Sequence, residues 1–366
     1  MSGLKTLALS LLGALAQASG PPASSPPREL FRIEEKGSFL ENLVIRPGNG
    51  DVLVTRLDVP GIYSVTDPSS SSSFPFSSSS SSSSNSSAPP KLLTAVPGVQ
   101  HVLGITPVEI LDGRETYVVV GGDFDASVLP MVPVPGSSRA FALSFDAATG
   151  EAALEHVSTL SPSSRLVNGA AAVPGVPGVV LVADSQAGTV GRLDVSAGTF
   201  DAEAFPPLQE MAPVAGASVG LGVNGVRVHR SHLYWTNTDL VSIYRLALTP
   251  EGLPRDGDDA AAELVVDLSG RAVALDDFDF SGGDIIVTTN LDHQILRVAA
   301  DTGAVELVMG SPNETTVAGC TSLKVGGDGG DVVYVATTQA DVDGHVVPAR
   351  LLAFELDAAE ESSSRA

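Results

Sequence analysis

The feature that most constrains the fold of this chain is a unit that recurs six times along it. The unit reads as a strand, a tight turn, a returning strand, a loop and a third strand, and Leu221–Leu246 is its clearest copy. In that copy apolar and polar residues alternate on both sides of the turn His229–His232, as in half-buried antiparallel strands. The copies follow one another at intervals of about 45–65 residues. They start at Glu41, Leu103, Asn168, Asn224, Asp276 and Thr321. We therefore predict an all-β fold, a six-bladed β-propeller.

The two ends of the chain are expected to close this ring. Within the strand-like segment Glu29–Glu35, Phe31–Ile33 should pair beside Leu351–Leu356 inside one blade. The propeller then covers residues 29–357, and a polar tail follows at 358–366. Residues 69–87, inside the first unit, are almost pure serine and cannot bury enough apolar surface to offset the entropy of ordering. We expect this insertion to be disordered.

Residues 1–18 have the pattern of a secretory signal peptide. Lys5 supplies a positive start, Leu7–Leu15 is an apolar run too short to cross a bilayer, and Ala16–Ala18 is a small-x-small cleavage site. A Pro/Ser linker follows at residues 19–28. No other stretch has the run of about 18 apolar residues that a membrane span needs. We therefore expect a protein of the secretory pathway or a secreted protein.

Charge and residue usage narrow the partners. The chain has 43 acidic and 20 basic residues, a net charge of −23, which argues against nucleic acid and against anionic membrane surfaces. Its single cysteine, Cys320, excludes an intramolecular disulfide and is expected to be a buried apolar residue. The Asn-x-Ser/Thr sequences at Asn85 and Asn313 are candidate glycosylation sites. We expect a monomer.

The start positions of the units point to a site on the propeller axis. The innermost strands line the central channel, so the six start positions should form a ring at one mouth of it. Four of them carry carboxylate or amide oxygens that suit Ca²⁺ better than Zn²⁺, namely Glu41, Asn168, Asn224 and Asp276. The alternative is that these side chains only bond strand ends around a water-filled channel. Asp276 and Asn224 are also the candidate catalytic residues.

The loops after the second strands should surround the same mouth. They and the adjacent strand ends supply the candidate substrate-binding residues. These are His101, Asp184, Ser185, Trp235, Asn237 and Asn290. We found no Ser-His-Asp spacing, GxSxG elbow, P-loop or Rossmann fingerprint that would indicate another chemistry.

These residues carry a resemblance to a known superfamily. Glu41, Asn168 in LVNG, Asn224 in GVNG and Asp276 in ALDDFDF stand where proteins of the SMP-30/gluconolactonase-like superfamily hold a divalent cation. The usual Pro-Asp-Gly is Leu275-Asp276-Asp277 here, so Asp277 is an alternative ligand. The resemblance implies a six-bladed propeller with a cation, Ca²⁺, near the channel centre. The openings of the first and fourth units look like those of secreted fungal members, among them hetero-Diels–Alderases of secondary metabolism.

Three functions remain open at this point. The first is a cyclase that joins a polyketide-derived ortho-quinone methide to a terpene alkene, small hydrophobic substrates held in the propeller mouth. The second is a calcium-dependent lactonase or esterase, in which the cation polarises a carbonyl group. The third is a propeller that binds a ligand without catalysis, since fold does not fix function.

Overall fold

The computed structural model describes residues 26–67, 90–109, 113–326 and 332–356. The expected signal peptide, most of the linker, the serine insertion with Asn85, and the whole tail lie outside these ranges. Asn313 lies within them and is exposed. No helix in the described ranges is long and apolar enough to cross a membrane.

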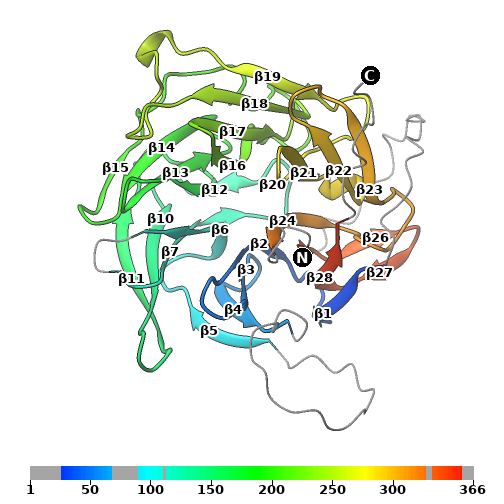
Figure 1. Ribbon diagram of the computed structural model, residues 1–366. Helices are drawn as coiled ribbons and strands as arrows, with labels where there is room; N and C mark the ends of the chain where they lie inside the picture. The colour runs from blue at the N-terminus through cyan, green and yellow to red at the C-terminus, as the bar shows by residue number, and fades with distance from the viewer. Residues whose placement is uncertain (1–25, 68–89, 110–112, 327–331, 357–366) are drawn as a thin grey trace, which may run out of the picture.

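Six four-stranded antiparallel sheets surround a central channel, which confirms the six-bladed propeller (Figure 1). The first three blades follow the chain from their innermost to their outermost strand. Blade 1 contains β2 (Leu40–Ile45), β3 (Val52–Arg56), β4 (Gly61–Val65) and β5 (Lys91–Ala95). Blade 2 contains β6 (His101–Val108), β7 (Thr116–Gly122), β10 (Arg139–Phe145) and β11 (Ala152–Thr159). Blade 3 contains β12 (Val167–Ala172), β13 (Val179–Asp184), β14 (Thr189–Asp194) and β15 (Thr199–Asp201).

The last three blades complete the circle. Blade 4 contains β16 (Val223–His229), β17 (His232–Asn237), β18 (Ser242–Ala247) and β19 (Glu263–Asp267). Blade 5 contains β20 (Phe278–Ser281), β21 (Asp284–Thr288), β22 (Gln294–Ala299) and β23 (Val305–Gly310). Blade 6 contains β24 (Cys320–Gly326), β25 (Val332–Thr337), β28 (Ala349–Glu355) and β1 (Arg28–Ile33). Two 3₁₀ turns are η2 (Gly257–Asp259) and η3 (Asn290–Asp292).

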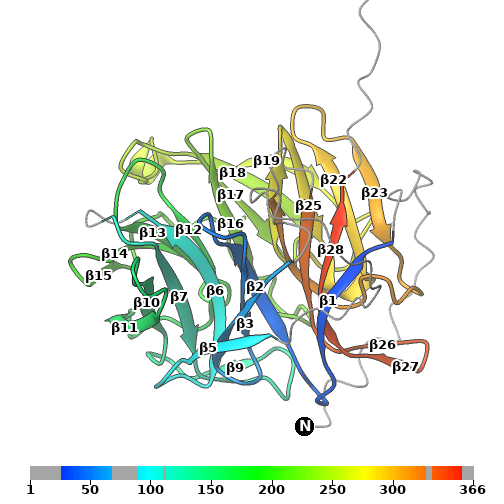
Figure 2. The same cartoon turned by 60° about the horizontal axis from the view of Figure 1, so that its bottom comes forward.

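Two short hairpins project from the loops after second strands, β8–β9 (Phe124–Asp125 and Val132–Pro133) and β26–β27 (Ala340–Val342 and His345–Val347). Figure 2 shows β9 and β26–β27 at the same lower end of the molecule. This end carries the loops that the sequence places around the channel mouth, and we call it the mouth face. The opposite end carries the tight turns between first and second strands.

Apolar side chains fill the spaces between blades rather than the channel. Trp235 is completely buried between blades 3 and 4, against Leu181 of β13 and Val226 of β16. Tyr117 of β7 is likewise buried against blade 1, near Leu53. Each sheet therefore uses both of its faces to bury apolar area, which is the main stabilising contribution in a chain with no disulfide.

The innermost strands pack against one another all the way round the axis, with β2 next to both β6 and β24. Threonine hydroxyls on neighbouring strands join them: Thr55 Oγ1 donates to Leu103 O at 2.7 Å and Thr321 Oγ1 donates to Leu40 O at 2.8 Å. The approach is close enough to require glycine. A Cβ at Gly104 would lie 2.2 Å from Asn168 O, and one at Gly169 would lie 2.4 Å from Asn224 O.

The ring closes through both ends of the chain, as the sequence predicts. β1 pairs antiparallel with β28, with Phe31 opposite Leu351 and Ile33 opposite Ala349. Next to this seam, the buried Asp67 carboxylate at the end of blade 1 accepts two hydrogen bonds from Arg28, at 2.9 and 3.1 Å, and one from Tyr334 Oη at 3.1 Å. The seam is therefore held by side chains from blade 1 as well as by the strand pair.

Replacing Asp67 with alanine is expected to lower the free energy of unfolding by about 2–3 kcal/mol, because the hydroxyl of Tyr334 then stays buried without its partner. Urea denaturation followed by fluorescence measures the loss. The Tyr334→Phe variant removes only one of the bonds and should lose about 1 kcal/mol. A loss for Asp67→Ala no larger than that for Tyr334→Phe would mean that the Arg28 pair does not hold the seam.

Candidate functional site

The ring positions of blades 1–4, four of the six, lie where the register between the first and second strands shifts. These bulges occur between Leu40 and Leu43, Val102 and Ile105, Val167 and Ala170, and Val223 and Val226. A bulge inserts a residue and re-aims the side chains beside it. As a result, consecutive residues at a start position can both reach the channel, as Glu41 and Asn42 do on β2.

Asp276 is the centre of the polar contacts at the mouth. Its carboxylate accepts hydrogen bonds from Asn224 Nδ2 at 3.1 Å and from Asn290 Nδ2 at 2.7 Å. Asn224 Nδ2 also donates to Thr238 Oγ1 at 3.0 Å. The structure thus brings together two of the predicted ligands and one predicted substrate-binding residue, and it places Asp276, rather than Asp277, beside Asn224.

Glu41 is buried beside this group. Burial raises the pKa of the Glu41 carboxyl well above its ordinary value, and the nearby carboxylates of Asp276 and Asp277 raise it further. Burial likewise raises the pKa of Asp276 to about 7, against the hydrogen bonds from Asn290 and Asn224. Asn168, the fourth predicted ligand, is also buried. Within the described ranges neither Glu41 nor Asn168 has a hydrogen bond from its side chain.

A second polar layer lies deeper in the channel, around Asp277. One oxygen, Asp277 Oδ2, accepts hydrogen bonds from Ser322 Oγ at 2.6 Å, Arg227 Nη2 at 2.8 Å and Asn42 Nδ2 at 3.3 Å. The other, Oδ1, is buried without a hydrogen-bond partner among the described residues. These contacts join strands β2, β16 and β24 to the residue that precedes β20, across the axis.

A third layer lies toward the opposite end and contains Asp279 and Lys324. Asp279 Oδ1 is 3.6 Å from Arg227 Nε, and Asp279 Oδ2 is 3.8 Å from Lys324 Nζ. Sequence reasoning missed Asn42, Arg227, Asp279, Ser322 and Lys324. The signal was present, because Asp277 and Asp279, and Ser322 and Lys324, are polar residues two apart on innermost strands.

The ion pairs in the channel show which layer contains carboxylates without a positively charged partner. Arg227 pairs with Asp277 at 2.8 Å and Lys324 lies near Asp279, which leaves Glu41 and Asp276 with no ion pair to a cationic side chain in the described ranges. Two buried carboxylates without a cation need either a proton or a bound cation. The predicted ligand set adds the amides of Asn168 and Asn224, whose oxygens are of the kind that Ca²⁺ takes, while the structure turns Asn224 Nδ2 toward Asp276 at 3.1 Å. In the described ranges no three His, Cys, Asp or Glu side chains form a metal group, so the fit depends on the amides.

Four of the predicted substrate-binding residues have side chains that form hydrogen bonds with backbone groups. Asn237 Nδ2 donates to the carbonyl oxygens of Glu210 and Ala212, at 3.1 and 3.0 Å. Trp235 Nε1 also donates to Glu210 O, at 2.9 Å, and its ring is in the core. Both ring nitrogens of His101 lie within 3.0 Å of carbonyl oxygens, and its ring stacks on Phe124. Asp184 is the fourth, with the role described next.

Asp184 accepts a hydrogen bond of a kind that recurs in several blades. The aspartate that follows the second strand accepts a backbone N–H from the segment that enters the same blade. Asp184 Oδ2 accepts Arg165 N at 2.7 Å, and Asp292 Oδ2 accepts Val273 N at 2.7 Å. The same bond is made by Asp58, Asp123 and Asp239. Ser185 is completely buried next to it. We call the buried carboxylates Glu41 and Asp276, with the amides of Asn168 and Asn224, the carboxylate ring. Of the six predicted substrate-binding residues, only Asn290 has a hydrogen bond to it.

An apolar cluster lies on the mouth face over blades 1–4, and we call it the mouth cluster. It joins residues next to the ring positions with residues from the second loops and the β8–β9 hairpin. Its buried members are Leu57, Leu103, Phe124, Leu166 and Leu221, packed against Phe39, Ala126, Met131 and Val219. The sequence does not show that Met131 comes near Leu221, since these residues are brought together only by the fold.

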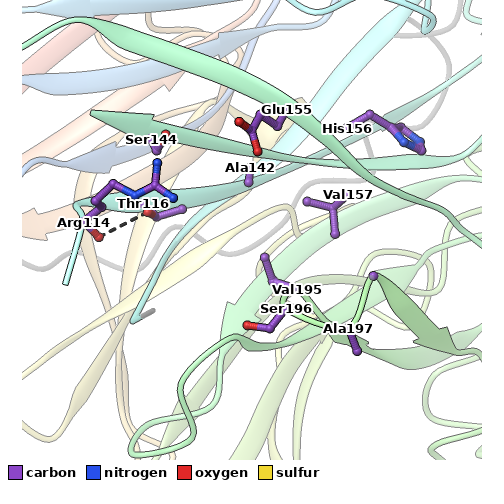
Figure 3. A pocket seen from close by; sticks show the side chains of 11 residues that line it. Arg114, Thr116, Ala142, Ser144, Glu155, His156, Val157, Val195, Ser196 and Ala197 are labelled. Carbon is purple, nitrogen blue, oxygen red and sulfur yellow. Dashed lines mark hydrogen bonds between the residues drawn. The ribbon is translucent and has the colours of Figure 1, made fainter. Parts of the chain in front are cut away.

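A hollow of about 330 Å³ lies elsewhere, between blades 2 and 3 (Figure 3). Thr116 at the start of β7, Ser144 near the end of β10 and the turn 195–198 line it, which places it at the end opposite the mouth face. Arg114 and His156 border it without converging on a common point in Figure 3. The carboxylate ring remains the stronger candidate site because its groups do converge.

Comparison with known proteins adds to this picture. No protein-family model matches the chain. A candidate hetero-Diels–Alderase of Sarocladium schorii is 26% identical over 268 residues, which are 66% of this chain and 59% of that protein. A candidate hetero-Diels–Alderase of a Phoma species is 23% identical over 243 residues, 62% of this chain and 63% of that protein. The chain thus spans about three fifths of the length of these relatives.

Solved structures match the whole fold. The regucalcin of Agrobacterium tumefaciens, described as a calcium-binding protein, is 14% identical with a TM-score of 0.57, over 91% of this chain and 94% of that one. A candidate gluconolactonase is 14% identical with a TM-score of 0.55, over 92% and 93%. The protein is a six-bladed β-propeller with the architecture of these structures. In sequence it is similar to the two candidate hetero-Diels–Alderases.

Proposed function

We propose that the protein is a hetero-Diels–Alderase, a cyclase that joins an ortho-quinone methide to a terpene alkene at the channel mouth. The observation that carries this proposal is the similarity to two relatives named for that activity, over 66% and 62% of the chain. The mouth cluster supports it, because its partly exposed members place apolar side chains on the same face as the buried polar ring; these are Phe39, Ala126, Met131 and Val219.

The geometry suits a reaction that needs positioning more than proton transfer. Holding diene and alkene together against an apolar wall replaces a bimolecular encounter and can supply several kcal/mol. The raised pKa of Asp276, about 7, and that of Glu41 keep a proton on this pair near neutral pH. A protonated carboxyl can donate a hydrogen bond to the carbonyl oxygen of the quinone methide and make it a better electrophile. Asn224 and Asn290 hold Asp276 in place through its two oxygens.

We also propose that Ca²⁺ can take the place of this proton, held by Glu41, Asn168, Asn224 and Asp276, since two buried carboxylates need one or the other. A bound cation would supply Lewis-acid polarisation of a carbonyl oxygen. Passage through the secretory pathway, with a glycan on the exposed Asn313, completes the proposal.

A calcium-dependent lactonase is the second candidate, and the oxygen set of the ring favours it. A cation held by Glu41 and Asp276 would polarise the lactone carbonyl and open it to attack by water. The fold likeness to a candidate gluconolactonase is compatible with either function, since fold does not fix function. A propeller that binds its ligand without catalysis remains the third candidate.

The Glu41→Gln variant separates the first two candidates. Glutamine keeps a hydrogen-bond donor and removes the charge, so a cyclase that works by positioning should keep its rate within about tenfold. A metal-dependent hydrolase should lose orders of magnitude in turnover. The assay follows formation of the cyclic adduct from an ortho-quinone methide generated in solution and a terpene alkene, by chiral chromatography.

The matched control is Glu151→Gln, the same change at an exposed position in the turn between β10 and β11, away from the channel mouth. Efficient opening of simple lactones that requires calcium and is lost in Glu41→Gln would replace the cyclase with the hydrolase. Absence of both reactions, with retained binding of the substrates, would favour the ligand-binding protein.

A further inference from the structure

Lys324 lies at the end of the channel opposite the carboxylate ring, and neither the ring nor the mouth cluster uses it. It is on the innermost strand β24 and faces Asp279 of the adjacent strand β20. The chain has only four lysines, the others being Lys5, Lys36 and Lys91. Lys36 and Lys91 are exposed, whereas the side chain of Lys324 is 17% exposed. This is therefore the one lysine of the described residues that lies inside the propeller.

The surroundings of Lys324 leave its amine poorly partnered. Asp279 Oδ2 lies 3.8 Å from Lys324 Nζ, which is beyond hydrogen-bond distance. That oxygen already accepts the backbone N–H of Val325 at 3.1 Å. An ammonium group has three donors, and in the described ranges Lys324 Nζ makes no hydrogen bond. The side chain as a whole remains 17% exposed.

Such a residue is costly to keep for stability alone. A buried ammonium loses its hydration, and a single long ion pair does not offset that loss. A methionine would fill the same space without this cost. Burial lowers the pKa of Lys324, the positive charge of Arg227 lowers it further, and Asp279 and Asp277 act in the opposite direction. The neutral amine, which is the nucleophilic form, is therefore easier to populate here than on an exposed lysine.

We propose that Lys324 is a nucleophilic amine that binds the carbonyl group of a small aldehyde or ketone in the channel and condenses with it to an imine. Nζ forms a bond to the carbonyl carbon as the carbon–oxygen π bond breaks. Both amine protons pass to the carbonyl oxygen, which leaves as water, so the products are a neutral imine and one water molecule. Asp279, 3.8 Å away, can carry a proton between nitrogen and oxygen. The imine site is separate from the carboxylate ring and does not depend on the proposed cyclase.

The experiment compares the lysines inside one folded protein. The native protein is incubated at about pH 7 with propanal and cyanoborohydride, which fixes an imine as a secondary amine, and the labelled peptides are quantified by mass spectrometry. We expect Lys324 to be labelled at least about fivefold faster than Lys36 and Lys91, because a neutral amine is rarer at an ordinary pKa of about 10.4. In urea the three rates should become equal.

The pH profile and one variant complete the test. The labelling rate of Lys324 should level off at a lower pH than that of Lys36, and Lys324→Met should fold, with labelling only at the exposed lysines. If Lys324→Met does not fold, the comparison within the native protein still decides. Labelling of Lys324 at or below the rate of Lys36 and Lys91 in the native protein would overturn the proposal.

Discussion

Replacing Asp277 with alanine is expected to lower the free energy of unfolding by about 3–5 kcal/mol. The Asp277 side chain is 3% exposed and pairs with the Arg227 guanidinium, whose side chain is 11% exposed. It also accepts hydrogen bonds from the hydroxyl of Ser322 and the amide of Asn42, so one carboxylate joins the innermost strands β2, β16 and β24. Without it Arg227 loses its closest partner inside the channel and Ser322 loses its acceptor. Urea denaturation of the folded protein measures the loss.

Two further variants show whether charge or position matters. Asp277→Asn keeps the volume and one acceptor oxygen but not the charge, and should lose less than the alanine variant. Asp279→Ala removes a carboxylate that is 19% exposed and whose distances to Arg227 and Lys324 are longer, 3.6 and 3.8 Å. This change should cost no more than about 2 kcal/mol. A loss below about 1 kcal/mol for Asp277→Ala would show that Arg227 is compensated by another group.

The fold could be predicted from the sequence because its signals are local and repeated. Alternating apolar residues around His229–His232 indicate two strands of one blade, and five further copies fix the number of blades. The closing strand was also predictable, since Phe31–Ile33 is an apolar strand with no partner in its own neighbourhood and the ring needs one. Long-range pairing of this kind follows from topology rather than from local propensity.

The site was predictable only in part, for reasons that lie in the strand register. A period of two gives the residues that face the channel on a regular strand, but bulges at start positions such as those of β2 and β16 shift that count, and Asp276 and Asp277 precede β20. The sequence therefore cannot show that Asn42 and Glu41 share the channel, or that Asp276 and Asp277 face different layers of it. Nor does it show that Asp184 caps an incoming segment, because the acceptor and the Arg165 N–H meet only through the turn of the chain.

In protein stripped of divalent cations, stability is expected to fall as the pH rises from about 4 to about 7. The pKa of Asp276 is raised from 3.8 to about 7 on folding, so the folded protein binds this proton more tightly than the unfolded chain does. The full stability is present below the unfolded pKa and is lost as the carboxyl ionises, a loss of the order of 4 kcal/mol, after which the curve is flat. Glu41, whose pKa is also raised, acts with the same sign. Urea denaturation across this pH range measures the slope.

Calcium should reverse this dependence, because it binds the ionised carboxylates of the native ring and stabilises the folded state by mass action. With Ca²⁺ well above its dissociation constant, stability should stay level or rise between about pH 4 and pH 7.

Asp292, whose pKa burial raises to about 6, adds a decline of its own, so the informative quantity is the difference between the wild type and Asp276→Asn. That variant should lose the share of the decline that belongs to Asp276 and most of the response to calcium, while Glu151→Gln keeps both. If the curves with and without calcium coincide, the ring holds a proton and not a cation, and a neutral carboxyl then remains to act on the quinone methide oxygen. If the stripped protein shows no decline that Asp276→Asn abolishes, the two carboxylates are not held together in the buried mouth, and both the cation and the proton donor lose their physical basis.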